Sequence, residues 1–226
     1  SVSPTSNALV LVSVNQRSTS GNTPQAVTVT GNGLTWVEIA TRDYSGTRGR
    51  QHIFRAMGAS PSAGAINIAI AGSSCQSFSW IVDQATGIDT SGTNGSGAII
   101  QSSGNSTDSF NTILTVTLAA LTDATNNAVF MATGYDETAA AATPGSGYSE
   151  LADYAVPSNL TAIQTQYKVP GTTTPNVGGI PSYADVGCVA IEIKMAAAGG
   201  GLSIPVALQN MRGSFSPLSL GGFING

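Results

Sequence analysis

The sequence predicts an all-β protein, an antiparallel β-sandwich with two repeated halves and an extended C-terminal tail. Segments in which apolar and polar residues alternate recur along the chain, separated by clusters of Gly, Asn, Pro and Ser. No segment shows a convincing helical period; the run 139–142 is too short, and Pro144 with Gly145 ends it. Strand-like segments also occur twice in the same order, which predicts two similar halves.

The alternation places strands along most of the chain. They are expected at residues 8–14, 25–30, 34–42, 50–57, 65–71, 76–83, 111–118, 127–134, 148–155, 161–169 and 186–195. Residues 8–12 are apolar on both faces, so this segment is expected to be a central strand covered from both sides. Trp80 shares a strand face with Phe78 and Val82, which makes it a core residue. The Gly- and Ser-rich stretches 87–109 and 171–182 are expected to be long surface loops.

The repeat is visible in paired segments. Residues 7–14 (Asn-Ala-Leu-Val-Leu-Val-Ser-Val) are echoed by residues 127–134 (Asn-Ala-Val-Phe-Met-Ala-Thr-Gly), and residues 31–40 are echoed by 145–154. A chain of 226 residues can bury a full core in one domain. We therefore expect one sandwich domain over 1–198, with half-repeats at about 7–83 and 111–195, followed by a Gly hinge and tail over 199–226.

The C-terminal tail is apolar and carries a single charge, Arg212, between residues 202 and 226. Residues 202–209 alternate with period two, and Pro205 lies on the face opposite the apolar residues, which suits an edge strand. The tail either packs on its own sandwich or reaches a neighbouring subunit. The residues expected to carry such contacts are Leu202, Ile204, Val206, Leu208, Met211, Phe215, Leu218, Leu220 and Phe223.

Composition limits the partners. Eight basic residues against twelve acidic ones argue against nucleic acid, because phosphate binding needs clustered Lys and Arg. The one basic cluster, Arg42, Arg48, Arg50 and Arg55, is expected to be a solvated hairpin rim. Only 9 % of residues are charged, and such a surface suits a molecule covered by neighbours. No apolar run is long enough to span a membrane as a helix.

No group of residues forms a convincing catalytic motif. His52 has no nucleophile motif near it, and Gly-x-Ser-x-Gly is absent. The acidic residues that could form a glycosidase pair are Glu38, Asp43, Asp83, Asp136, Glu137, Glu150 and Asp153, but acids of this number occur on any soluble surface. The sequence therefore predicts a protein that is not an enzyme and holds no cofactor or zinc site; a loop calcium ion near Asp83 and Asp89 stays an alternative.

The two cysteines, Cys75 and Cys188, occupy similar places in the two half-repeats, each three residues before an apolar residue of its strand. Alternation puts each on the face opposite that apolar residue. A disulfide would form only if the two strands were neighbours, and the alternative is two sheltered free thiols.

The strand segments at 7–12, 27–36, 52–57, 65–70 and 77–83 together resemble a broad group of jelly-roll-like β-sandwich domains. That group occurs in tailed-phage virion proteins and in bacterial secreted or surface proteins, and the resemblance covers roughly residues 6–195. It implies a jelly-roll-like fold and no shared catalytic residues. The tail after Gly201 lies outside the resemblance.

Taken with the tail, the resemblance implies a structural protein of a viral particle at the virion surface. The expected role is a phage capsid decoration (cement) or surface-appendage subunit that binds copies of itself or a virion shell protein. A related alternative is an extracellular filament subunit at the cell surface. An alternative of another class is a carbohydrate-binding module, in which Trp36 and Tyr44 would stack on sugar rings.

Overall fold

The computed structural model describes residues 1–109, 113–136, 140–156, 161–182 and 184–196. This part of the chain contains fourteen strands and one short 3-10 helix. The strands are β1 (Leu9–Ser18), β2 (Val27–Gly31), β3 (Val37–Tyr44), β4 (Gly49–Ala56), β5 (Ile66–Ile70), β6 (Cys75–Ala85), β7 (Ile99–Thr107), β8 (Ile113–Thr115), β9 (Ala128–Tyr135), β10 (Thr143–Pro144), β11 (Ser149–Ala155), β12 (Ala162–Lys168), β13 (Asn176–Gly178) and β14 (Val186–Ile193), and the helix is η1 (Ser96–Ala98).

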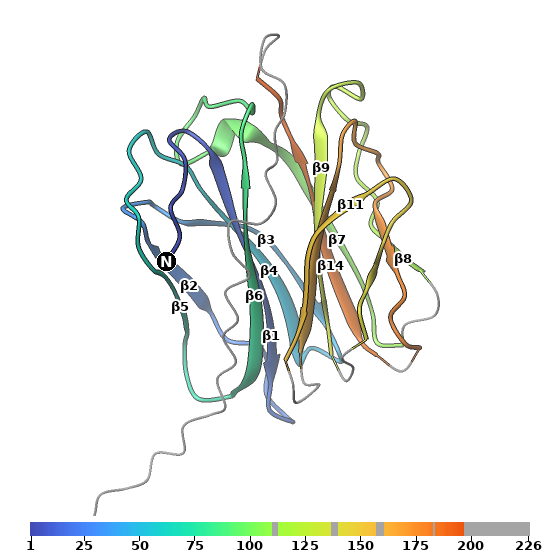
Figure 1. The fold of residues 1–226 in the computed structure, drawn as a ribbon. Helices are drawn as coiled ribbons and strands as arrows, with labels where there is room; N and C mark the ends of the chain where they lie inside the picture. The colour runs from blue at the N-terminus through green and yellow to red at the C-terminus, as the bar shows by residue number, and fades with distance from the viewer. Residues whose placement is uncertain (110–112, 137–139, 157–160, 183, 197–226) are drawn as a thin grey trace, which may run out of the picture.

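The strands form four layers of antiparallel sheet (Figure 1). Two large sheets lie in the middle, in the orders β3-β4-β1-β6 and β11-β12-β9-β14-β7. The β2-β5 pair covers the outer face of the first, and the β10-β13-β8 sheet covers the outer face of the second. The all-β antiparallel class expected from the sequence is confirmed.

Strand β1 shows why the layers form. Its residues are buried along the whole strand, and they alternate between two cores. Leu9 and Leu11 enter the core between the large sheets, whereas Val10 and Val12 pack under the β2-β5 pair. The expectation of a central strand covered on both sides is therefore confirmed, because a strand that is apolar on both faces needs a layer on each.

Three main cores hold the layers together. The central core joins the two large sheets and comprises Leu9, Leu11, Ile53, Met57, Ala85, Ile88, Ala98, Ala128, Phe130, Ala132, Val189, Ile191 and Ile193. One outer core is built on Val10, Val12, Val14, Phe54, Phe78 and Val82, with Trp80 and Trp36 packed against it. The other is built on Leu114, Val116, Leu118, Val129, Met131, Tyr135 and Cys188. Trp80 therefore packs against a core, as the sequence predicts.

The strands of the two halves pair in the same order. In the first half, β3-β4-β1-β6 form one sheet and β2 pairs with β5. In the second half, β11-β12-β9-β14 form one sheet and β10 pairs with β13. Both β3 and β11 also contain a bulge, at Ile39 and Leu151, directly after a glutamate.

The two stretches expected to be loops contain strands. Stretch 87–109 includes β7, an edge strand paired with β14, and stretch 171–182 includes β13, the middle strand of its sheet. Strand β7 reads Ile-Ile-Gln-Ser-Ser-Gly-Asn-Ser-Thr, a composition typical of loops. Small residues fit there because β7 lies close to β3: a Cβ at Gly104 would lie 3.3 Å from the Cβ of Arg42.

Candidate functional site

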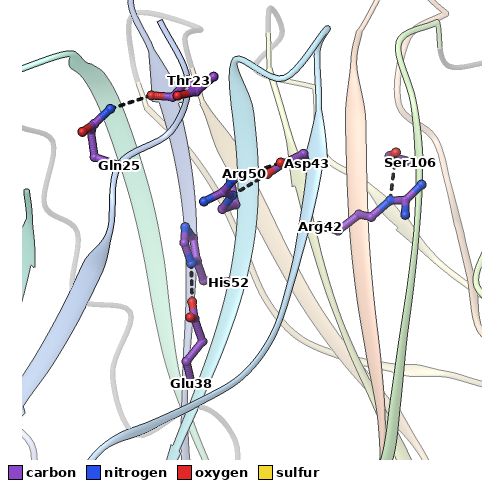
Figure 2. A network of polar contacts seen from close by, with 8 residues as sticks. All are labelled: Thr23, Gln25, Glu38, Arg42, Asp43, Arg50, His52 and Ser106. Atoms are coloured by element: carbon purple, nitrogen blue, oxygen red, sulfur yellow. Dashed lines mark hydrogen bonds and ion pairs between the residues drawn. The ribbon is translucent and has the colours of Figure 1, made fainter.

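Polar side chains of β3 and β4 form two interacting pairs, His52 with Glu38 and Arg50 with Asp43 (Figure 2). His52 Nδ1 lies 2.6 Å from Glu38 Oε1, and the imidazole stacks on Phe54 with ring centroids 6.0 Å apart. His52 is buried, while the side chain of Glu38 is 44 % exposed. One row further along the same face, Arg50 makes a bidentate ion pair with Asp43, with a second contact of 2.9 Å between Nη2 and Oδ2.

A bulge and the strand register put these groups on one face. The bulge at Ile39 places Glu38 opposite Phe54, and Thr41 is then opposite His52 and Asp43 opposite Arg50. Alternation therefore brings the two pairs onto the outer face of the sheet. The hydrogen bonds with Asp43 raise the pKa of Arg50 and keep its guanidinium charged.

These contacts anchor the imidazole. Within the described residues, His52 contacts Glu38 through one ring nitrogen and Phe54 through its ring face, and its buried Nε2 has no hydrogen-bond partner. A carboxylate that orients a histidine is one part of a catalytic apparatus, but general base catalysis also needs a hydroxyl or thiol in reach of the second nitrogen. The residues paired with His52 across the sheet are Val14 and Thr41. The Glu38–His52 contact therefore joins strand β3 to strand β4.

The four arginines expected to form one rim are separated. Arg50 lies on the outer face of β4, whereas Arg42 lies on the inner face of β3 and donates from Nε to the Ser106 hydroxyl on β7, 3.0 Å away (Figure 2). Arg55 is paired with Leu11, so it also lies on the inner face, and Arg48 is in the β3–β4 turn. Alternation within the two strands disperses the cluster, and the expectation of a single hairpin rim is wrong.

A second polar group lies between the two large sheets, and the sequence analysis missed it. Asn15 Nδ2 donates to the backbone oxygens of Tyr135 (3.1 Å) and Ala162 (2.7 Å) on the facing sheet. The buried Tyr44 hydroxyl donates to Asn15 Oδ1 at 2.6 Å. Burial raises the pKa of Tyr44 well above its ordinary value, so the phenol stays protonated as a donor. The sequence does contain a signal for this group. Asn15 lies on the same face of its strand as Leu9 and Leu11, so a polar residue occurs at a position expected to face the core.

A buried ion pair lies beside this group. Arg17 Nη1 is 3.4 Å from Asp136 Oδ2, and both side chains are almost fully buried. The other oxygen of Asp136 accepts from the backbone N–H of Asp185 at 3.2 Å. The pair connects β1 of one large sheet to the end of β9 in the other. Because both charged side chains are buried, removal of either one is expected to destabilise the fold.

The acids Glu150 and Asp153 lie together on β11, because the bulge at Leu151 puts both on its outer face. Asp153 accepts from the Tyr135 hydroxyl at 3.0 Å and from the backbone N–H of Ala142 at 2.6 Å. Burial raises the pKa of both carboxyl groups, and Asp153 adds to the rise at Glu150. Asp153 therefore connects β11 to the Tyr135 side chain and to the backbone at Ala142. Glu137 lies outside the described residues.

Glu192 shows the same structural use of an acid. Its carboxylate accepts from Gln101 Nε2 (2.6 Å), Thr122 N (2.9 Å) and Asn127 Nδ2 (2.7 Å). Burial would raise its pKa, but these donors together lower it, so the carboxylate stays charged. Among the described residues, no group of three or more His, Cys, Asp or Glu side chains is arranged to hold a metal ion.

The two cysteines are free thiols in different cores. Cys75 packs against the outer core of the first half, and Cys188 is in the outer core of the second half. Two large sheets separate these cores, so the disulfide considered from the sequence does not form. A β-bulge where β6 meets Ser18 also puts Cys75 in the same core as Phe78, contrary to the expectation of opposite faces. Burial raises the pKa of Cys75 to about 11 and that of Cys188 to about 12.

The aromatic residues of the carbohydrate-binding alternative do not share a surface. Tyr44 is 2 % exposed, and its ring lies between Gly49 of its own sheet and Gly187 of the facing sheet. Trp36 packs against the first outer core and donates from Nε1 to the Gly31 carbonyl at 3.2 Å. Tyr44 therefore cannot stack on a sugar ring, and that part of the alternative is wrong.

The remaining candidate residues, those of the tail from Leu202 onward, lie outside the described residues. Within the described residues, no helix has the length and apolar character needed to cross a membrane. Comparison with protein-family models, with curated proteins and with solved structures found no match.

Proposed function

We propose that this chain is a non-enzymatic structural protein of a viral particle, a phage capsid decoration or surface-appendage subunit at the virion surface. In this role a jelly-roll-like sandwich presents its loops, and the C-terminal tail contacts copies of the same chain or a shell protein. The observation that carries the proposal is the tail itself: 25 residues from Leu202 to Gly226 with ten large apolar side chains and one charge. An apolar segment of this size needs a surface to cover it.

The polar groups of the described fold support a scaffold role. The His52–Glu38, Arg17–Asp136 and Glu192 contacts each join separate strands or loops. Polar groups used in this way stabilise the contacts between strands and loops of the fold. Low surface charge also supports association, because charge repulsion normally keeps free monomers apart.

The proposal is tested by measuring the molar mass of the purified full-length protein by light scattering over a range of concentrations. A chain ending at Ala198 and a full-length variant carrying Phe215→Ser, Leu218→Ser and Leu220→Ser are measured in parallel. The serine variant keeps the length of the tail and removes only apolar surface. Association of the full-length chain alone, with both comparison proteins folded and monomeric, would support the proposal.

Incorporation into particles is the second measurement. Deletion of residues 202–226 is expected to abolish incorporation into the assembled particle, whereas a protein that assembles normally without them would refute the assembly role. If all three proteins are equally stable monomers, self-association is excluded and the shell protein is the partner to test by co-sedimentation with particles.

A further inference from the structure

The faces that the two large sheets turn toward each other change from apolar to polar along their length. On β1, Leu9 and Leu11 enter the central core, and Asn15 follows on the same face with its amide bonded to the facing sheet. On β6, Ala85 enters that core, whereas Ser79 lies further along the same face and is paired with Asn15. One end of this interface is therefore apolar and the other end is polar.

Strands β6 and β12 face each other across this interface. Ile81 of β6 packs on Ile163 of β12. Two residues further along both strands, Thr165 lies close enough to Asp83 to offset part of the rise in the pKa of that carboxyl group. The two strands therefore run in the same direction here, and side chains on their inner faces meet in successive pairs.

Two residues back along both strands, the same spacing brings Ser79 of β6 opposite Thr161, which lies directly before β12. A hydrogen bond from the neighbouring strand supports this placement. Asn15 is paired with Ser79 and donates to the Ala162 carbonyl at 2.7 Å, so the start of β12 lies against this part of the first sheet. The Thr161 carbonyl also accepts from the Val156 N–H at 2.9 Å, which fixes its backbone. The two residues therefore face each other at the polar end of the interface.

The hydroxyl groups of Ser79 and Thr161 are buried without a hydrogen-bond partner among the described residues. Both residues are 0 % exposed, and the hydroxyl of Ser13, on the inner face of β1, is buried in the same way. A buried hydroxyl group that bonds to nothing costs free energy, because it has given up its hydrogen bonds to water. Protein interiors satisfy such groups with an internal water molecule where no protein atom does so.

We propose that a water molecule binds between the two large sheets and bridges the hydroxyl groups of Ser79 and Thr161. A hydroxyl group can both donate and accept, which suits a neutral molecule that does the same. Internal waters make about three hydrogen bonds. The third partner is Asn15 Oδ1, which accepts from the Tyr44 hydroxyl and has a second lone pair.

Water is a better occupant of this place than a metal cation. Hard cations prefer carboxylate ligands, and at this end of the interface Asp136 is already paired with Arg17. The bridge gives β6 a polar contact with the start of β12, beside the one that Asn15 gives to β1. This inference rests on the contacts between the two large sheets and does not require the proposed function.

A high-resolution crystal structure of the whole chain tests the site directly. Density for a water molecule is expected about 2.8 Å from both Ser79 Oγ and Thr161 Oγ1. Thr161→Val keeps the shape of the side chain and removes its hydroxyl, so this variant should lose the water. The control, Thr165→Val, changes a second fully buried threonine on the inner face of β12 and should keep it. No water between the two hydroxyl groups in the wild-type structure, or an unchanged water in Thr161→Val, would overturn the proposal.

Unfolding in urea separates a hydroxyl group that binds water from one that is only buried. Ser79→Ala and Thr161→Val should each raise the unfolding equilibrium constant about tenfold, because the bound water loses a partner. The double variant should raise it by much less than the product of the two effects. Unchanged or lower constants in the single variants, the result expected when an unpartnered hydroxyl is replaced by an apolar group, would contradict the bridge. Neither measurement depends on association, so failure here is distinct from failure of the light-scattering test.

Discussion

Asp83 shows what burial between two sheets does to a single carboxyl group. Its side chain faces the second large sheet on the inner side of β6, and neither carboxyl oxygen has a hydrogen-bond partner among the described residues. Burial raises the pKa of Asp83 to about 7, and the neighbouring Thr165 offsets part of the rise. A carboxyl with a raised pKa binds more protons in the folded state than in the unfolded one. The free energy of unfolding therefore falls as pH rises from about 4 to about 7.

The substitution Asp83→Asn removes this titration and keeps the size of the side chain. At pH 8 the variant should have a free energy of unfolding higher than wild type by about 2–4 kcal/mol, because it avoids a buried charge. At pH 4, where Asp83 is protonated when folded, the difference should nearly vanish. Urea unfolding at the two pH values measures both. Equal effects at pH 4 and pH 8 would contradict a buried titrating carboxyl.

The burial of a single side chain could be predicted from the sequence only where the residues of its own strand determine it. Alternation identified Trp80 as a core residue, because its own strand carries that information. The carbohydrate-binding alternative required Tyr44 to lie on the surface, but the structure buries its ring against Gly187, which is distant in the chain. No pattern within residues 37–44 indicates that a glycine of another sheet leaves room for this ring.

The positions of the strands could be predicted from the sequence better than the core into which each side chain points. Each predicted strand segment overlaps a strand of the structure, while β7, β10 and β13 were missed because their residues are small, polar or few. The sequence echo aligns Val10 with Phe130, but Val10 enters an outer core and Phe130 the central one. The row Glu38–Phe54–Val12 in one sheet matches the row Glu150–Gln166–Met131 in the other. By strand pairing Val12 therefore corresponds to Met131, whereas the sequence repeat aligns it with Ala132. A shift of one residue moves each side chain to the opposite face of its sheet.

Close contact between the two large sheets makes a prediction for β9. A Cβ at Gly134 would lie 2.6 Å from Asn15 Cγ and 2.6 Å from Gln51 Oε1. Gly134→Ala should therefore lower the free energy of unfolding by roughly 1–3 kcal/mol, because Asn15 must move from its two backbone acceptors. Gly64→Ala is the matched control, since a Cβ there meets nothing within 4 Å. Equal stability of the two variants in urea titrations would show that the sheets can separate at Gly134 without loss.

At the scale of the molecule, the two halves share one central core. Each half has an outer core of its own, but Leu9, Leu11 and Ile53 of the first half and Phe130, Val189 and Ile191 of the second contribute to one central core. The Asn15 hydrogen bonds and the Arg17–Asp136 pair cross the same interface. Neither large sheet can expose its inner face without exposing that of the other. This arrangement favours unfolding of both halves together.

Phe130→Ala tests that coupling, because Phe130 is 1 % exposed and lies in the central core. The substitution should cost about 3–5 kcal/mol and lower the midpoint of a single transition. Phe78→Ala, in the outer core of the first half, should shift the same transition, since that half cannot unfold alone while the central core holds. Calorimetry measures both, and the ratio of calorimetric to van't Hoff enthalpy should stay near one. Two resolved transitions, with each variant moving a different one, would show that the halves are independent domains that only touch.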